Sequence, residues 1–230
     1  MEDTVAIIPM RAGSKGLPQK NIKPLAGKPL YRYAVDEALE AGIGRVLIST
    51  DIPELPEMVA SSRVETLPRP AALAGDAVPM ADVMMHVLEA EVDPEQIVVL
   101  LQPTSPLRDA THIASALEVF RTSDSPLLMS VSEKERSILK YGFVEGDRYI
   151  PLGQAEWVFS NRQALPPVFG PNGAIYIFEA GWFLKNGGFA SPDVAVFEMD
   201  QTTSLDIDCQ ADFMLCEAAI NSRNNQKADV

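Results

Sequence analysis

Short apolar runs alternate with amphipathic helical segments along most of this chain, and that rhythm limits the folds open to it. Three runs, at residues 5–9, 45–49 and 96–101, are rich in β-formers and bounded by turn residues. Over residues 79–91, apolar residues recur at the spacing of an amphipathic helix. Strand–helix alternation is typical of a mostly parallel sheet with helices on both faces. We therefore expect a three-layer α/β/α, Rossmann-like core.

The rhythm stops over residues 132–171. This segment has short β-like pieces and a Pro-Pro pair without a helical pattern, and a strand returns at residues 174–178. We interpret residues 1–131 as the α/β core and residues 132–171 as a small, β-rich inserted arm. Residues 172–230 then return to the core and end in a helix.

A basic loop, "MRAGSKGLPQKN", follows the first apolar run and gathers Arg11, Lys15 and Lys20. In open α/β sheets, ligands bind beyond the carboxyl ends of the strands, where this loop would lie. Gly13 and Gly16 let backbone N–H groups approach an anion, and Ser14 adds a hydroxyl donor. The loop matches neither the Walker A nor the dinucleotide fingerprint. We expect it to bind a polyphosphate; the alternative is a solvated basic turn.

The overall charge narrows the class of partner. The formal net charge is −13, which argues against nucleic acid and anionic membranes as partners. A local basic cluster in an acidic chain favours a small, highly charged anion instead. No apolar run in the sequence is long enough to span a bilayer, and the first residues lack the features of a signal peptide. We expect a cytoplasmic protein.

Two carboxylates near the end of the chain, Asp206 and Asp208 in "SLDID", are spaced two apart. In an extended segment such side chains share a face and can converge. Mg²⁺ takes few carboxylates and completes its shell with phosphate oxygens and water. We predict that this pair binds Mg²⁺ or Mn²⁺. Asp208 could instead cap the final helix, which does not exclude a metal role.

"IIPMRAGSKGLPQKN" resembles the signature of the CMP-sialic acid synthetases, the cytidylyltransferases that activate nonulosonic acids. Further matches follow in order and cover nearly the whole chain: "STD", "RPAALAGD", "DVMMHVL", "LQPTSPLR", "RQALP", "NGAIYI" and "SLDID". The resemblance implies that a sugar acid and CTP give the CMP-sugar and pyrophosphate. Composition and spacing alone indicate only a nucleotide-binding α/β protein.

The resemblance also implies roles on the nucleotide side. Lys20 would stabilise the reacting and departing phosphates, and Asn21 would lie at the ribose or base. Lys20, Arg11 and Asp206 would be catalytic. The full nucleotide-binding set is Arg11, Gly13, Ser14, Lys15, Lys20, Asn21, Arg69 and Asp76. Arg69 has a structural alternative as an ion-pair partner on its Pro-rich loop.

On the sugar side, the resemblance implies contacts from Gln102, Lys140, Arg162, Tyr176 and Phe189. Phe189 would reach across a dimer interface towards the partner's sugar site. Gly170 departs from the family, because sialic acid synthetases usually carry an arginine there. Either the substrate is another nonulosonic acid, or a neighbouring arginine replaces the missing cation.

The arm carries many large apolar residues but is too small for its own core, so they should be buried on another surface. Packing on the chain's own sheet is one option. The resemblance favours the other, a homodimer in which each arm lies on the second subunit.

Three alternatives to the sialic-type synthetase stay open: a nucleotide-sugar-dependent glycosyltransferase, a cytidylyltransferase for Kdo or another sugar acid, and a catalytically silent nucleotide-binding protein.

Overall fold

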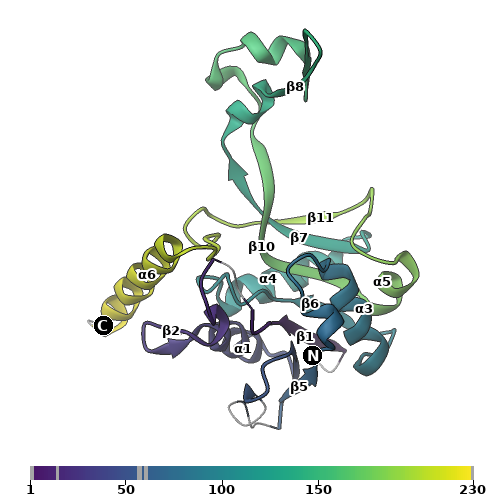
Figure 1. Cartoon of the computed structure of the whole chain (residues 1–230), viewed down its shortest axis with the longest axis vertical. Coiled ribbons are helices and arrows are strands. Elements are labelled where there is room, and N and C mark those ends of the chain that lie inside the picture. Colours follow the sequence, from purple (N-terminus) through teal and green to yellow (C-terminus); the bar gives the residue numbers. More distant parts are fainter. Residues whose placement is uncertain (1–2, 14–15, 56–58, 60–61, 229–230) are drawn as a thin grey trace.

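The computed structural model describes residues 3–13, 16–55, 59 and 62–228, which form an α/β core from which an arm projects (Figure 1). The strands of the central sheet are β1 (Thr4–Pro9), β4 (Arg45–Thr50), β5 (Val64–Pro68), β6 (Ile97–Leu100), β7 (Leu127–Lys134), β10 (Val168–Glu179) and β11 (Ala195–Glu198). Within the described residues their order is β11-β7-β10-β6-β1-β4-β5. β10 runs antiparallel to β6 and β7, and the other neighbours are parallel. The predicted mostly parallel sheet is confirmed.

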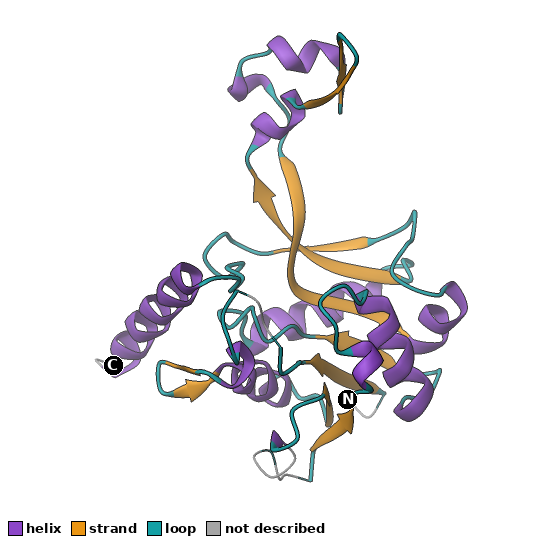
Figure 2. Ribbon diagram, in the orientation of Figure 1, coloured by secondary structure: helices purple, strands orange, loops and turns teal. Residues whose placement is uncertain are grey.

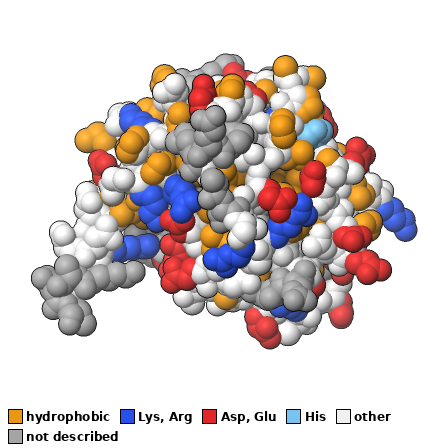
Figure 3. Space-filling model, turned by 90° about the horizontal axis from the view of Figure 1, so that it is seen from below, with side chains coloured by type: hydrophobic (Ala, Val, Ile, Leu, Met, Phe, Trp, Pro, Cys, Tyr) orange, Lys and Arg blue, Asp and Glu red, His pale blue; other side chains and the backbone are white. Residues whose placement is uncertain are grey.

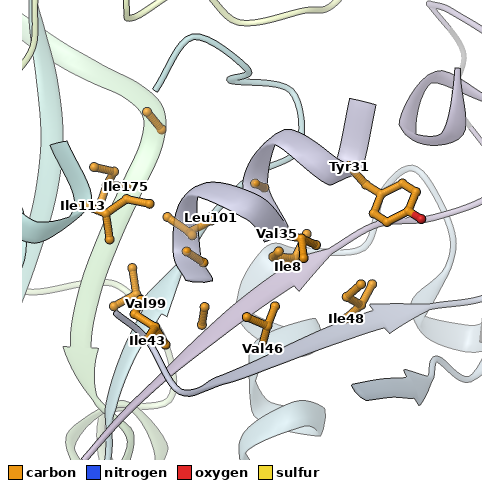
Figure 4. Close-up of a cluster of buried hydrophobic side chains, with 14 of the residues drawn as sticks. Ile8, Tyr31, Val35, Ile43, Val46, Ile48, Val99, Leu101, Ile113 and Ile175 are labelled. Carbon is orange, nitrogen blue, oxygen red and sulfur yellow. The ribbon is translucent and has the colours of Figure 1, made fainter. Parts of the chain in front are cut away.

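Helices cover both faces of the sheet. α1 (Leu30–Glu40) and α4 (Ala110–Thr122) pack on one face, and α3 (Met80–Glu91) and α5 (Ala180–Asn186) pack on the other. Alternate residues of a strand point to opposite faces, so Ile8 of β1 joins the first cluster and Ile7 joins the second. Figure 4 shows Ile8 beside Val35 of α1. The three-layer α/β/α fold is therefore confirmed.

The last helix, α6 (Gln210–Ala228), packs at the side of the core (Figure 1). Phe213, Cys216 and Ile220 of α6 form a third buried cluster with Leu25 and Tyr33. Leu25 belongs to a small hairpin of β2 (Pro24–Leu25) and β3 (Lys28–Pro29), and Tyr33 lies in α1. This packing brings residues 205–208, the acidic segment that precedes α6, back to the carboxyl end of β1.

The arm is a ribbon of two strands with a small irregular tip (Figure 2). β7 and β10 leave the sheet together, and their register continues to the pair Lys134 and Val168. The tip holds a hairpin and three 3₁₀ turns: β8 (Gly142–Glu145), β9 (Arg148–Pro151), Arg136–Lys140, Ala155–Phe159 and Arg162–Ala164. Residues 132 and 171 lie inside β7 and β10, so arm and core share these strands.

Lys and Arg side chains are interspersed with Asp and Glu on the face opposite the arm (Figure 3). Within the described ranges, no helix combines the length and hydropathy that a membrane span requires.

Candidate active site

The loop at the carboxyl end of β1 is held by hydrogen bonds within the chain. We call residues 10–21 the β1 loop. The Ala12 N–H donates to Asp51 Oδ1 at 2.7 Å, and the buried Asn21 donates its amide Nδ2 to the Arg11 carbonyl at 3.0 Å. The Asn21 side chain, which we expected at the ribose or base, therefore shapes the loop. Ser14 and Lys15 lie outside the described residues.

Three of the predicted nucleotide-binding side chains lie together beside this loop. Arg11 forms an ion pair with Asp76, and the two side chains are 31% and 33% exposed. Arg69 is buried and donates to the Ser49 carbonyl at 2.8 Å and to Ser49 Oγ at 3.2 Å. Burial lowers the pKa of Arg69, nearby Asp51 raises it, and Arg11 lowers it further. Arg69 also lines a cavity of about 510 Å³ between the ends of β4 and β5.

The β1 loop touches the acidic segment directly. Lys20 Nζ donates to the Ile207 carbonyl and lies 3.7 Å from Asp208 Oδ1. A Cβ atom on Gly16 would lie 2.2 Å from the Asp208 carbonyl oxygen, so only glycine fits at this crossing. Gly13, by contrast, has open space around it. The Lys20 ammonium group therefore lies next to the predicted metal-binding pair, Asp206 and Asp208. In the sequence, only the family resemblance suggested that these residues would meet.

Asp206 and Asp208 have different surroundings. Ile207 between them is fully buried, Asp206 lines a large cavity, and the Asp208 side chain is 85% exposed. Burial raises the pKa of Asp206 above its usual 3.8; Asp208 raises it too, whereas the Thr104 hydroxyl and Lys20 lower it.

The carboxylate oxygens of Asp206 and Asp208 are ligands of the kind that a hard divalent ion prefers. Asp206 Oδ1 is buried without a hydrogen-bond partner among the described residues. Within the same ranges, no three His, Cys, Asp or Glu side chains gather as metal ligands. Two carboxylates alone leave most of a Mg²⁺ shell for phosphate and water, which is how this ion binds in nucleotide sites.

The large cavity has a volume of about 1230 Å³ and lies where the arm leaves the core. The core contributes Gln102, Tyr176 and Asp206, and the arm contributes Lys134, Arg136 and Arg162. Burial raises the pKa of Tyr176, and the nearby Asp206 raises it further. The structure therefore brings three predicted sugar-side residues, Gln102, Arg162 and Tyr176, to one cavity with Asp206.

Two buried residues that the sequence analysis did not single out support this site: Asn172 lines the cavity, and Arg108 holds the backbone of Gln102, which lines it. Asn172, beside the irregularity in β10, donates to Ser204 Oγ at 2.9 Å, which ties the strand to the residue directly before the acidic segment. Arg108 is fully buried and donates to the carbonyls of Gln102, at 3.3 Å, and Ala174, at 2.6 Å. Asn172 lies in the motif "NGAIYI" and Arg108 in the motif "LQPTSPLR". These two motifs were the sequence signal that could have identified them.

Two predicted sugar-side residues do not line this cavity. Lys140 lies on the arm, where its carbonyl accepts a hydrogen bond from the Tyr149 hydroxyl. Phe189 packs in an aromatic cluster of its own chain, and its expected place across a dimer interface stays a prediction. Its ring centroid lies 4.8 Å from Phe183 and 5.7 Å from Tyr176, so here it supports Tyr176 from behind.

Known proteins resemble this chain in sequence and in fold. A family model described as Cytidylyltransferase matches residues 5–142. The N-acylneuraminate cytidylyltransferase of Escherichia coli O18:K1:H7 is 34% identical over 98% of this chain and 54% of its own length. The CMP-N,N'-diacetyllegionaminic acid synthase of Legionella pneumophila is 32% identical over 93% of this chain and 94% of its own.

A solved structure extends the likeness to the fold. CMP:2-keto-3-deoxy-manno-octonic acid synthetase, solved with CTP, aligns with a TM-score of 0.71 at 18% identity, over 96% of this chain and 99% of that one. The chain spans about half the length of the N-acylneuraminate cytidylyltransferases that it matches. The family model covers more than half of the chain, and the relatives agree with it. The chain belongs to the cytidylyltransferase family, as its resemblance to the CMP-sialic acid synthetases predicted.

Proposed function

We propose that this protein transfers CMP from CTP to a sugar acid of the nonulosonic class and releases pyrophosphate. The observation that carries the proposal is the contact between the β1 loop and the acidic segment. Through it, Lys20 lies against the acidic segment at Asp208, and Asp206 lies at the wall of the large cavity. The names of the relatives from Escherichia coli and Legionella pneumophila support the substrate class.

The reaction is a displacement at phosphorus. The anomeric hydroxyl oxygen of the sugar acid forms a bond to the α-phosphorus of CTP, and the bond to the oxygen bridging to the β-phosphorus breaks. Pyrophosphate leaves with the bonding electrons, and the hydroxyl proton is lost to water. Such a transfer depends on alignment and on charge stabilisation. Lys20, with its side chain 11% exposed and anchored at Ile207, is preorganised to stabilise the departing phosphates.

Asp206 and Asp208 would hold Mg²⁺ or Mn²⁺. The bound ion would polarise the α-phosphate and favour the deprotonated hydroxyl. The partnerless, buried Asp206 Oδ1 supports this role, because a buried carboxylate oxygen needs a cation or a donor. Arg11, Arg69 and Asp76 would bind the nucleotide, with the loop atoms of Gly13, Ser14 and Lys15 around the triphosphate.

We further propose a cytoplasmic homodimer. Large apolar side chains on the arm stay exposed within one chain, including Phe143 at 64% and Phe159 at 91%. Such a surface favours a protein partner, and a two-fold interface would use both arms at once. Lys140 could then contribute to the partner's cavity rather than its own.

Pyrophosphate release from CTP, measured with sialic, legionaminic, pseudaminic and Kdo acids in turn, tests the function. We expect release only with a sugar acid and a divalent ion, together with an equal amount of CMP-sugar. No release with any of them would overturn the proposal. Sugar transfer from a CMP-sugar without pyrophosphate release would favour the glycosyltransferase alternative.

A further inference from the structure

The arm side of the large cavity holds three cations, and two of them are already paired. Arg136 Nη2 lies 2.7 Å from Glu133 Oε1, and its Nε donates to the same oxygen at 3.1 Å. Arg162 Nη2 lies 2.8 Å from Glu135 Oε2. Each arginine charge is therefore offset by a glutamate before any ligand arrives.

Lys134 is the third cation. It lines the same cavity, and its side chain has neither a hydrogen bond nor an ion pair among the described residues. Its positive charge is therefore available to a ligand. A carboxylate that enters the cavity would meet one uncommitted cation there.

The aliphatic part of the Lys134 side chain lies against Gly170. The two residues are diagonal neighbours on the paired strands, because Lys134 faces Val168 and Ser132 faces Gly170. A Cβ atom on Gly170 would lie 3.2 Å from Lys134 Cγ and 3.3 Å from Lys134 Cε. The Gly170 backbone lies outside the left-handed region, so the space above it, rather than its conformation, distinguishes it from other residues.

We propose that Lys134 binds the carboxylate of the sugar acid and that Gly170 gives it the room to do so. The inference rests on the proposed function. Ammonium–carboxylate hydrogen bonds are charge-assisted and stronger than neutral ones. Gln102 and Tyr176 lie in the same cavity and would contact the neutral part of the sugar. Lys134 thereby selects acids over neutral sugars.

The test compares the sugar acid with its carboxamide as substrates at saturating CTP. Lys134→Ala should lower kcat/KM for the acid about 10- to 100-fold, mainly through KM, and should change the carboxamide little. The KM for CTP should stay unchanged. Lys185→Ala, an exposed lysine on α5, is the matched control and should behave as the wild type does.

Gly170→Val tests the second half of the proposal, because its side chain would occupy the space of the Lys134 chain. We expect it to raise the KM for the acid, and to add nothing in combination with Lys134→Ala.

Equal losses for acid and carboxamide in Lys134→Ala, or no loss for the acid, would overturn the role of Lys134 while leaving the proposed function intact. If the wild type turned over no sugar acid, the proposed function would fail first, and this inference with it.

Discussion

Two charged side chains of the β1 loop, Arg11 and Lys20, are fixed by neighbours in the same chain, whereas the arm exposes many of its large apolar side chains. Arg11 is paired with Asp76, and Lys20 is anchored on the acidic segment. Phe143 and Phe159 of the arm are 64% and 91% exposed. From this difference we infer that one chain builds the nucleotide side by itself, and that the sugar side depends on how the arm is held.

The strongest test of the nucleotide side is Asp206→Asn, which keeps the size of the side chain and removes its charge. We expect kcat to fall by about 10²-fold or more at ordinary Mg²⁺ concentrations, because a charge contact in the transition state is lost. Steady-state pyrophosphate release measures this. Asp124→Asn, on an exposed loop, is the control. Full activity of Asp206→Asn would remove the metal assignment.

Lys20 and Arg11 should separate two kinds of binding. Lys20→Ala should lower kcat by about 10²-fold with a smaller change in the KM for CTP, because negative charge grows on the departing pyrophosphate. Arg11→Ala should mainly raise the KM for CTP, as expected when ground and transition states are bound equally. Steady-state kinetics of both variants at varied CTP concentration measure kcat and the KM for CTP. A raised KM in Lys20→Ala together with a lowered kcat in Arg11→Ala would exchange the two roles.

The crossing of the β1 loop and the acidic segment can be tested by adding one methyl group. Gly16→Ala places a Cβ atom against the Asp208 carbonyl, so the two segments must move apart. We expect kcat to fall by about 10-fold, since small misplacements of catalytic groups are costly. Gly44→Ala is the control, because it has open space and no left-handed backbone. Equal activity of the two variants would show that the crossing is not needed for catalysis.

The pH dependence should give the smallest effect. Because burial raises the pKa of Asp206, the ionised carboxylate costs folding stability at every pH above that raised value. Asp206→Asn should therefore raise Tm by a few degrees at neutral pH without CTP or metal. The gain should shrink as pH falls through the raised pKa towards 3.8, where both states become protonated. Thermal unfolding across pH measures it; a lower Tm at neutral pH would contradict the prediction.

Local patterns predicted the parts of the fold that are buried on both faces. The runs that became β1, β4 and β6 each contain at least three consecutive buried apolar residues, so no tertiary information was needed. The edge strands β5 and β11 were not predicted, because their short mixed sequences become strands only by pairing with a neighbour.

The candidate site, like the fold, was predicted from the sequence only in part. Arg11, Lys20 and Asp206 could be named from charge and motif. The hydrogen bond from Ala12 to Asp51 and that from Asn172 to Ser204 join residues far apart in sequence, and no spacing rule reveals them. The three aromatic rings that Phe189 meets in its own chain were not predicted either, and its contact with a partner, which the resemblance implies, stays a prediction.

We propose that the nucleotide side is complete in one chain and that the sugar side needs a second. The double variant Phe143→Glu/Phe159→Glu should break the dimer, and Met214→Glu, an apolar residue of α6 that is 61% exposed, is the control. Light scattering should give twice 25.0 kDa for the wild type and the control, and 25.0 kDa for the double variant.

The deciding measurement is CTP binding by calorimetry and sugar-acid turnover, both on the monomeric double variant. We predict a Kd for CTP within about twofold of the wild type, since no charged contact of the β1 loop is altered, together with a raised KM for the sugar acid. A monomer that turns over the sugar acid as the wild type does, or one that no longer binds CTP, would contradict the account.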